Sequence, residues 1–170
     1  YLKNGKYDRQ CDKPSKIQYY ENGRIKFEYY HLNGQLHRQV DKPAIIQYYE
    51  NGNIQYDSYY LNNQLHREGD KPARIDYYEN GKIMYEHYYL NGEIHRDGDK
   101  PAIIQYYENG NIKSTIYYLN SKKYRECDKP TRIKYSPDGN IETNYWYDKN
   151  GKQFRKEVID YTIELTKCCR

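Results

Sequence analysis

The residues most capable of chemistry in this chain recur at fixed positions. One column of equivalent positions holds His37, His66 and His95. The next position along the chain holds Arg38, Arg67 and Arg96. Histidine can titrate near neutral pH or bind a metal, and arginine can bind carboxylates or phosphates. A metal site, however, needs several ligands that converge on one ion. Successive histidines are 29 residues apart, and later copies of the column hold Tyr124 and Phe154. The pattern therefore predicts packing, with no metal and no cofactor.

The carboxylates are plentiful, but their setting argues against catalysis. A catalytic pair needs two different environments that separate the pKa values of its members. The glutamates of the first turn instead share one repeated environment, at Glu21, Glu50, Glu79 and Glu108. The chain also lacks a nucleophile elbow, a phosphate-binding loop, a dinucleotide fingerprint and a zinc-protease motif. We therefore predict that the chain is not an enzyme.

The four cysteines do not form a recognisable framework. Cys11 and Cys127 occupy the same repeat position four units apart, much farther in a rigid array than the ~7 Å between Cα atoms that a disulfide tolerates. The adjacent Cys168 and Cys169 lack the spacing of a zinc site. This usage favours free thiols, and an intracellular or virion-associated location. An end-to-end bond between molecules is the alternative.

An internal repeat fixes the elements that must position these residues. The tripeptide Asp-Lys-Pro recurs every 29 residues, from Asp12 to Asp128. A period of this length is typical of a solenoid or array. The array spans 1–157, and a C-terminal cap follows. Its parts are a half-unit 1–13, full units 14–42, 43–71, 72–100 and 101–129, a degenerate unit 130–157 and the cap 158–170.

Each unit contains two turn signals and one proline break. In unit 72–100 the turns fall at Asn80-Gly81 and Asn91-Gly92. Asn-Gly suits the primed turns of tight hairpins, and proline ends a strand. Three short strands result, at about 73–78, 82–90 and 93–97. We predict an all-β fold, an elongated antiparallel β-meander or β-solenoid of 29-residue repeats.

The segment after Arg155 has no turn residues. Its apolar positions fit a helical stripe and strand alternation equally well. The length without glycine or proline favours a short C-terminal helical cap. Such an atypical end suits a repeat array.

Composition and charge narrow the function. The chain has 25 tyrosines, which supply apolar area while their hydroxyls stay hydrated or bonded, so we expect a thin, half-solvated sheet. Lys and Arg number 28 and Asp and Glu 24, interleaved in every unit. A phosphate-tracking groove should be more one-sided, so nucleic-acid binding is not favoured. No stretch approaches the ~20 apolar residues that span a membrane.

Comparison of the repeat copies assigns side chains to faces. Residues i and i+2 share a face, so Ile75 lies with Tyr77 and opposite Asp76. Second-strand isoleucines such as Ile83 are predicted on the buried face. Each column arginine precedes an aspartate by three or four residues, which predicts an Arg–Asp pair that closes the loop. The candidate interaction columns are the histidines and arginines above together with Tyr20, Tyr49, Tyr78 and Tyr107.

Segments 77–81 (Tyr-Tyr-Glu-Asn-Gly) and 88–92 (Tyr-Tyr-Leu-Asn-Gly) resemble the MORN repeat family. The likeness covers about residues 1–155 and is greatest for variants in which Tyr-Tyr-x-Asn-Gly precedes His-Arg-x-x-Gly/Asp-x-Pro-Ala. Such arrays are common in giant DNA viruses and some bacteria. The unit departs from the standard pattern because it holds two unequal turns and no Gly-x-Trp. The resemblance implies stacked β-hairpins, and roles in scaffolding, protein contact, dimerisation or lipid head-group contact.

Three functional hypotheses follow. The leading one is a non-catalytic structural or interaction protein that presents regular Tyr, His, Arg and Asp columns to protein partners or to further copies, for example in a virion. The second is a membrane-surface module that binds lipid. The third is a module that binds single-stranded nucleic acid, for which aromatic and basic side chains are suited.

Overall fold

The computed structural model describes residues 1–8, 12–39, 41–119 and 121–159. These residues form β-strands and no helix, which confirms the predicted all-β class. Accordingly, no helix within the described ranges could cross a membrane. The predicted cap 158–170 starts with Val158, which ends the last strand, and from residue 160 it lies outside the described residues.

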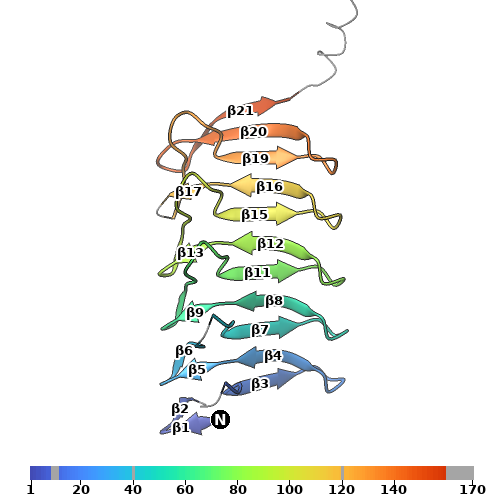
Figure 1. Ribbon diagram of the computed structural model, residues 1–170, viewed down its shortest axis with the longest axis vertical. Helices are drawn as coiled ribbons and strands as arrows, with labels where there is room; N and C mark the ends of the chain where they lie inside the picture. Colours follow the sequence, from blue (N-terminus) through green and yellow to red (C-terminus); the bar gives the residue numbers. More distant parts are fainter. Residues whose placement is uncertain (9–11, 40, 120, 160–170) are drawn as a thin grey trace, which may run out of the picture.

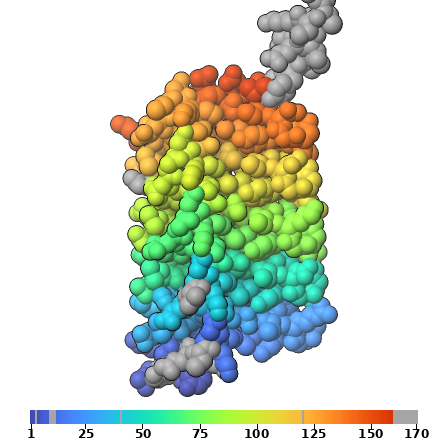
Figure 2. All heavy atoms as spheres, viewed as in Figure 1, coloured from blue at the N-terminus to red at the C-terminus, as the bar shows by residue number. Residues whose placement is uncertain are grey.

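An 11-stranded antiparallel sheet forms the body of the molecule, with strands in sequence order from one edge to the other (Figure 1). Its strands are β3 (Lys16–Tyr19), β4 (Ile25–Tyr29), β7 (Ile45–Tyr48), β8 (Ile54–Ser58), β11 (Arg74–Tyr77), β12 (Ile83–His87), β15 (Ile103–Tyr106), β16 (Ile112–Ile116), β19 (Arg132–Tyr135), β20 (Ile141–Tyr147) and β21 (Gln153–Val158). The units follow one another along the long axis as successive colour bands in Figure 2. The predicted elongated meander is therefore confirmed.

Five short hairpins lie along one side of this sheet, each a separate two-stranded sheet (Figure 1). They pair β1 (Leu2–Lys3) with β2 (Lys6–Tyr7), β5 (His31–Leu32) with β6 (Gln35–Leu36), β9 (Tyr60–Leu61) with β10 (Gln64–Leu65), β13 (Tyr89–Leu90) with β14 (Glu93–Ile94), and β17 (Tyr118–Leu119) with β18 (Lys122–Lys123). The prediction of three sheet strands per unit is thus wrong. A full unit adds two strands to the main sheet, which is about 10 Å at ~4.8 Å per strand.

The chain leaves the main sheet because one tyrosine per unit changes its backbone partner. The N–H of Tyr88 donates to the carbonyl of Ala102 in the next unit, at 2.8 Å. Its carbonyl instead accepts from the N–H of His95, which belongs to its own side hairpin, at 3.1 Å. Tyr88 is therefore the junction between the two sheets, and Tyr30 and Tyr59 make the same pair of bonds.

The two turns of a unit have different backbone geometry. At the second turn both residues are left-handed, with φ of 52° at Asn91 and 82° at Gly92, which confirms a primed turn. At the first turn only Gly81 is left-handed, and a β-bulge shifts the register so that Tyr77 faces Ile83. The expectation of primed turns is wrong there. The bulge also leaves Ile83 37% exposed, so the prediction that this column is buried is wrong.

The core is one side chain deep and lies on what we call the inner face of the main sheet. Its two clusters centre on Ala44 with Ile46 and on Ala102 with Ile104, and partly buried tyrosines pack against both. First-strand isoleucines are thus on the buried face, as predicted. We call the opposite side the open face.

The last unit closes the array differently. β20 continues straight through Trp146, and β21 folds back beside it in the main sheet, where Tyr145 faces Lys156. In the first full unit the same position, Tyr29, faces Ile45 of the following unit. β21 therefore occupies the place that the first strand of a further unit would take.

Candidate interaction surface

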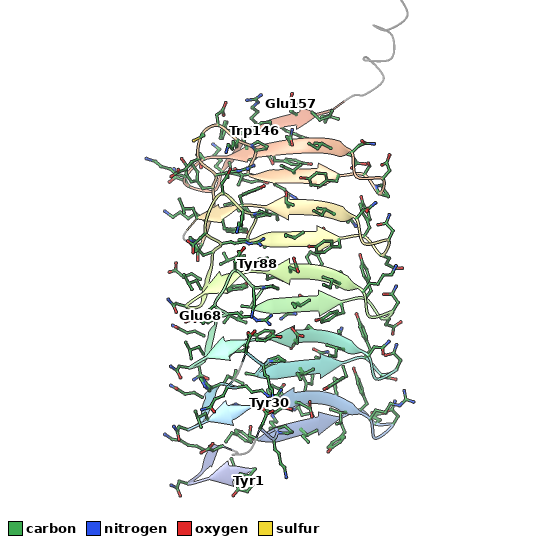
Figure 3. The ribbon with its side chains drawn as sticks, viewed as in Figure 1. Tyr1, Tyr30, Glu68, Tyr88, Trp146 and Glu157 are labelled. Carbon is green, nitrogen blue, oxygen red and sulfur yellow. The ribbon has the colours of Figure 1, made fainter. Side chains whose placement is uncertain are left out.

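A clamp made of one tyrosine, one arginine and one aspartate joins neighbouring units. The guanidinium carbon of Arg96 lies 3.6 Å from the centroid of the Tyr88 ring. Its Nε donates to Asp70 Oδ1 at 2.6 Å, and its Nη1 donates to the carbonyl of Pro101 at 3.2 Å. The remaining clamps combine Tyr30, Arg38 and Asp12, Tyr59, Arg67 and Asp41, and Tyr117, Arg125 and Asp99. Tyr30, Tyr88 and Trp146 mark every second level of the stack in Figure 3.

The aspartate of each clamp belongs to the preceding unit, 26 residues before the arginine. The predicted pair that closes a single loop is therefore wrong, since Arg96 binds Asp70 and Asp99 binds Arg125. Lys100 also donates to Asp70, at 2.7 Å. Hydrogen bonds from Arg96 and then Lys100 lower the pKa of Asp70 to about 2. The carboxylate thus stays ionised between two cations.

The last unit keeps the clamp with a larger ring. Arg155 lies 4.1 Å from the ring of Trp146, whose Nε1 donates to the carbonyl of Asp128 at 2.9 Å. The Arg155–Asp128 ion pair is longer, at 3.7 Å. Trp146 is 5% exposed, so it seals this end of the inner face.

The four candidate tyrosines also link units. Tyr78 Oη donates to the carbonyl of Tyr106 in the next unit, at 2.8 Å. The remaining three do the same, with Tyr20 to Tyr48, Tyr49 to Tyr77 and Tyr107 to Tyr135. The structure therefore places the hydroxyls of this column along the stack.

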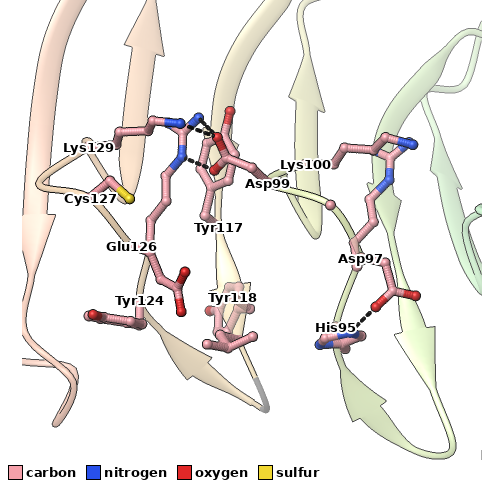
Figure 4. Close-up of a pocket in the computed structure, with 14 residues that line it drawn as sticks. His95, Asp97, Asp99, Lys100, Tyr117, Tyr118, Tyr124, Glu126, Cys127 and Lys129 are labelled. Atoms are coloured by element: carbon pink, nitrogen blue, oxygen red, sulfur yellow. Dashed lines mark hydrogen bonds and ion pairs between the residues drawn. The ribbon is translucent and has the colours of Figure 1, made fainter.

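The histidine column lines cavities between units. A cavity of 310 Å³ opens between His95 and the next unit's Tyr117, Tyr118 and Tyr124 (Figure 4). Nε2 of His95 lies 2.9 Å from Asp97 Oδ1, and similar cavities of 480 and 230 Å³ occur at preceding levels. The side chain of His66 is 9% exposed. Within the described ranges, no group of three potential ligands is placed to hold a metal.

A column of buried and half-buried polar groups on the inner face was not predicted from the sequence. On the inner face, Glu86 accepts from Tyr106 Oη at 2.9 Å, and Asp57 accepts from Tyr77 Oη at 3.1 Å. Burial raises the pKa of Asp57 to about 6. Strand alternation from the buried isoleucines would have found the column, whose members are Glu28, Asp57, Glu86, Thr115 and Asn144.

The open face differs from unit to unit. Its first-strand positions hold Lys16, Ile45, Arg74, Ile103 and Arg132, followed by Gln18, Gln47, Asp76, Gln105 and Lys134. Its second-strand positions hold Phe27, Tyr56, Tyr85, Ser114 and Thr143. Most of these side chains are half-buried, so this face can contact another molecule over its whole length.

Three segments of the chain, each containing the repeated hairpin, match a known family model. Residues 45–62, 74–95 and 103–120 each match the family model described as the MORN repeat variant. Each match begins at the first strand of a unit and extends at least to its second turn. No curated protein matches the chain. MORN repeats are typically non-catalytic and commonly mediate protein or membrane interactions. Three consecutive units of this chain are therefore similar to the MORN repeat variant, which confirms the resemblance at the level of the repeat.

Proposed function

We propose that this chain is a non-catalytic scaffold that binds protein partners through the open face of its main sheet. One observation carries the proposal. The recurring clamp residues and the Tyr20, Tyr49, Tyr78 and Tyr107 column are engaged in contacts between units, whereas most positions of the open face differ from unit to unit. A frame of this kind offers a distinct side-chain pattern at ~10 Å intervals.

In this proposal, the predicted interaction columns hold the units together and do not themselves bind the partner. The Arg96 side chain is 14% exposed and bound to Asp70, and His66 is 9% exposed. The only hydroxyl donor of Tyr78 is already hydrogen-bonded to the carbonyl of Tyr106. Such side chains have little surface or bonding capacity for a partner. Their contribution is to keep the open-face positions in register.

The partner we favour is another component of a large assembly, such as a virion, or another copy of this chain. Equivalent units at fixed spacing let many weak contacts act together, because each later contact forms at a high effective concentration. Binding strength should then depend on the number of units.

Photo-crosslinking in the native source tests which face binds. A benzophenone amino acid at Tyr85 or Gln105 reports on the open face, and the same probe at Asn109 reports on the exposed first turn. We expect one protein, identified by mass spectrometry, to be captured from both open-face positions and not from the turn. Capture from the turn alone would contradict the proposal. Capture of this chain itself would identify the partner as a second copy.

Deletion of whole units tests the avidity. Removing residues 43–71, or 43–100, preserves the repeat at the new junction. Affinity for the captured protein should fall in two steps, while the melting profile stays cooperative. Unchanged affinity would mean that only one unit, or an end of the array, makes the contact. Salt-sensitive co-sedimentation with anionic vesicles, unaffected by open-face substitutions, would point to a membrane role.

A further inference from the structure

Three cations surround a single tyrosine at the C-terminal end of the open face. Arg132 and Lys156 are the direct cross-strand neighbours of Tyr145, on β19 and β21. Lys134 lies two residues beyond Arg132 on the same face. The distances from the Arg132 guanidinium carbon and from Nζ of Lys134 and Lys156 to the ring centroid are 5.8, 5.7 and 5.8 Å.

None of the described carboxylates pairs with these three cations. Within the described part of the chain, no carboxylate oxygen lies within 4.0 Å of a charged nitrogen of Arg132, Lys134 or Lys156. Arg132 donates from Nε to Ser114 Oγ at 3.3 Å. Glu157, the acidic neighbour of Lys156, instead pairs with Arg155 at 3.8 Å. Among the residues that the structure describes, the cluster is therefore positively charged without a compensating carboxylate.

An earlier unit has an arginine at the equivalent position, and there its charge is neutralised within the unit. Arg74 occupies the position of Arg132, stacks 4.0 Å from the Tyr56 ring, and donates to Asp76 at 2.6 Å. His87 also lies 3.3 Å from Asp76. Lys134 stands where that unit has Asp76. The last unit thus has Lys134 in place of Asp76 and Lys156 in place of Ile103, so a cluster of like charges replaces an internal ion pair, which is unfavourable in the absence of a bound anion.

A second ring extends the cluster along β20. Nζ of Lys123, on the side hairpin, lies 5.6 Å from the ring centroid of Tyr147. Tyr145 and Tyr147 are both half-buried, so part of each ring remains accessible. Arg132 and Lys156 are two strands apart, or about 10 Å. Two rings and four cations therefore occupy one small area.

We propose that this cluster binds single-stranded nucleic acid. Its cations would contact backbone phosphates, while the Tyr145 and Tyr147 rings offer surfaces on which bases stack without sequence preference. An acidic peptide would use the cations and leave the rings unused, so the pairing of the two favours nucleic acid. The near balance of charge in the whole chain hides this site, because many of the acidic residues, such as Glu79, Asp99 and Glu86, lie in turns, in loops or on the inner face.

Fluorescence anisotropy with a labelled oligothymidylate tests the proposal on the full chain. We expect binding at about 50 mM salt, with a slope of log affinity against log salt of about −3, since four cations each contribute about −0.7 for a single strand. No binding, or binding that is insensitive to salt, would overturn the site.

Two aspartate substitutions separate the site from overall charge. Lys134→Asp reproduces the Arg74–Asp76 arrangement that this sheet position already accommodates, and should weaken binding about tenfold. Lys113→Asp changes the net charge by the same amount at an exposed position in β16, where Lys113 lies 5.2 Å from the Tyr107 ring. This control should change affinity less than twofold. Equal effects of the two variants would overturn the proposal.

The ring and the polymer class are tested separately. Tyr145→Leu keeps all four cations, so it should lower affinity about tenfold, by loss of stacking, and leave the salt slope unchanged. Circular dichroism melts identify any variant that fails to fold, and Lys134→Asp then remains informative. An oligoglutamate or an anionic vesicle that binds as tightly as the oligothymidylate would overturn the assignment to nucleic acid.

Discussion

Arg96 donates a hydrogen bond of 2.6 Å from its Nε to Asp70, a residue of the unit before its own. This single contact crosses a unit boundary, and it recurs at three further boundaries. The same arginine stacks on Tyr88 of its own unit and donates to the carbonyl of Pro101 in the following unit, so it contacts three consecutive units. Cohesion between units therefore depends on this clamp as well as on the strand ladder.

A double-mutant cycle should show that Arg96 is coupled to Asp70. Arg96→Ala removes the stacking on Tyr88 and both polar contacts, and we expect a loss of about 2 kcal/mol in the free energy of unfolding, measured with urea. In the double variant with Arg96→Ala and Asp70→Ala, the loss in the free energy of unfolding should differ from the sum of the two single losses. Asp99→Ala is the matched control, because Asp99 follows Arg96 in sequence but binds Arg125. Coupling to Asp99 rather than Asp70 would contradict the clamp.

Acid should loosen the array between about pH 4 and pH 2. Hydrogen bonds from arginine and lysine lower the pKa of Asp41, Asp70 and Asp99 from 3.8 to about 2. Their stabilising effect is complete above the unfolded pKa and is lost as pH falls through the folded pKa. Urea midpoints measured across this range at constant ionic strength should fall. Asp70→Asn should flatten that dependence, whereas an unchanged slope would assign the acid sensitivity elsewhere.

Asp57 should show the opposite pH dependence. Burial raises its pKa from 3.8 to about 6, so at neutral pH the folded protein holds a poorly solvated charge. This destabilisation is absent below the unfolded pKa and complete above the folded one. Asp57→Asn should stabilise the protein by about 1–3 kcal/mol at pH 7 and hardly at all at pH 3. Asn144 fills the equivalent place in the last unit, so the amide fits. A gain that persists at pH 3 would exclude an electrostatic cause.

The tyrosine hydroxyls should contribute separately at each boundary. Tyr78→Phe removes the donor to the Tyr106 carbonyl, and should lower the free energy of unfolding by about 1 kcal/mol. Tyr49→Phe and Tyr107→Phe remove the same contact at other boundaries, and all three losses should add in a triple variant. Tyr19→Phe is the control, because Tyr19 is 58% exposed. A control loss as large as that of Tyr78→Phe would argue against the bond.

The sequence was sufficient for the repeat, the all-β class and the places of the turns, because Asn91-Gly92 and Pro101 act locally on the backbone. It was not sufficient for the second strand's departure from the sheet at Tyr88. That bend arises because the Tyr88 N–H donates to Ala102 of the next unit while the Tyr88 carbonyl accepts from His95 of its own unit. No local residue type specifies that the two backbone groups bond to different sheets. The bulge before Ile83 similarly depends on pairing between strands.

The partner of Arg96 could not be read from the sequence for a different reason. Asp70 and Asp99 occupy identical positions in consecutive units, so residue type cannot distinguish them. Only the stacking of units shows that the preceding loop lies within reach. The open-face cluster was hidden in the same way, since counting charges does not reveal that Lys134 and Lys156 lie apart from every described carboxylate.

Identical clamps also affect how the chain reaches this structure. Arg125 would meet the same atoms at Asp70 as at Asp99 if the unit between them were looped out. Such a slip forfeits the contacts of one unit, while the entropy of closing a 29-residue loop grows only slowly with length. During folding, registers offset by whole units therefore compete with the native one. Contacts between units that differ from one boundary to the next, such as Arg74 with the Tyr56 ring, distinguish the correct neighbour from its copies.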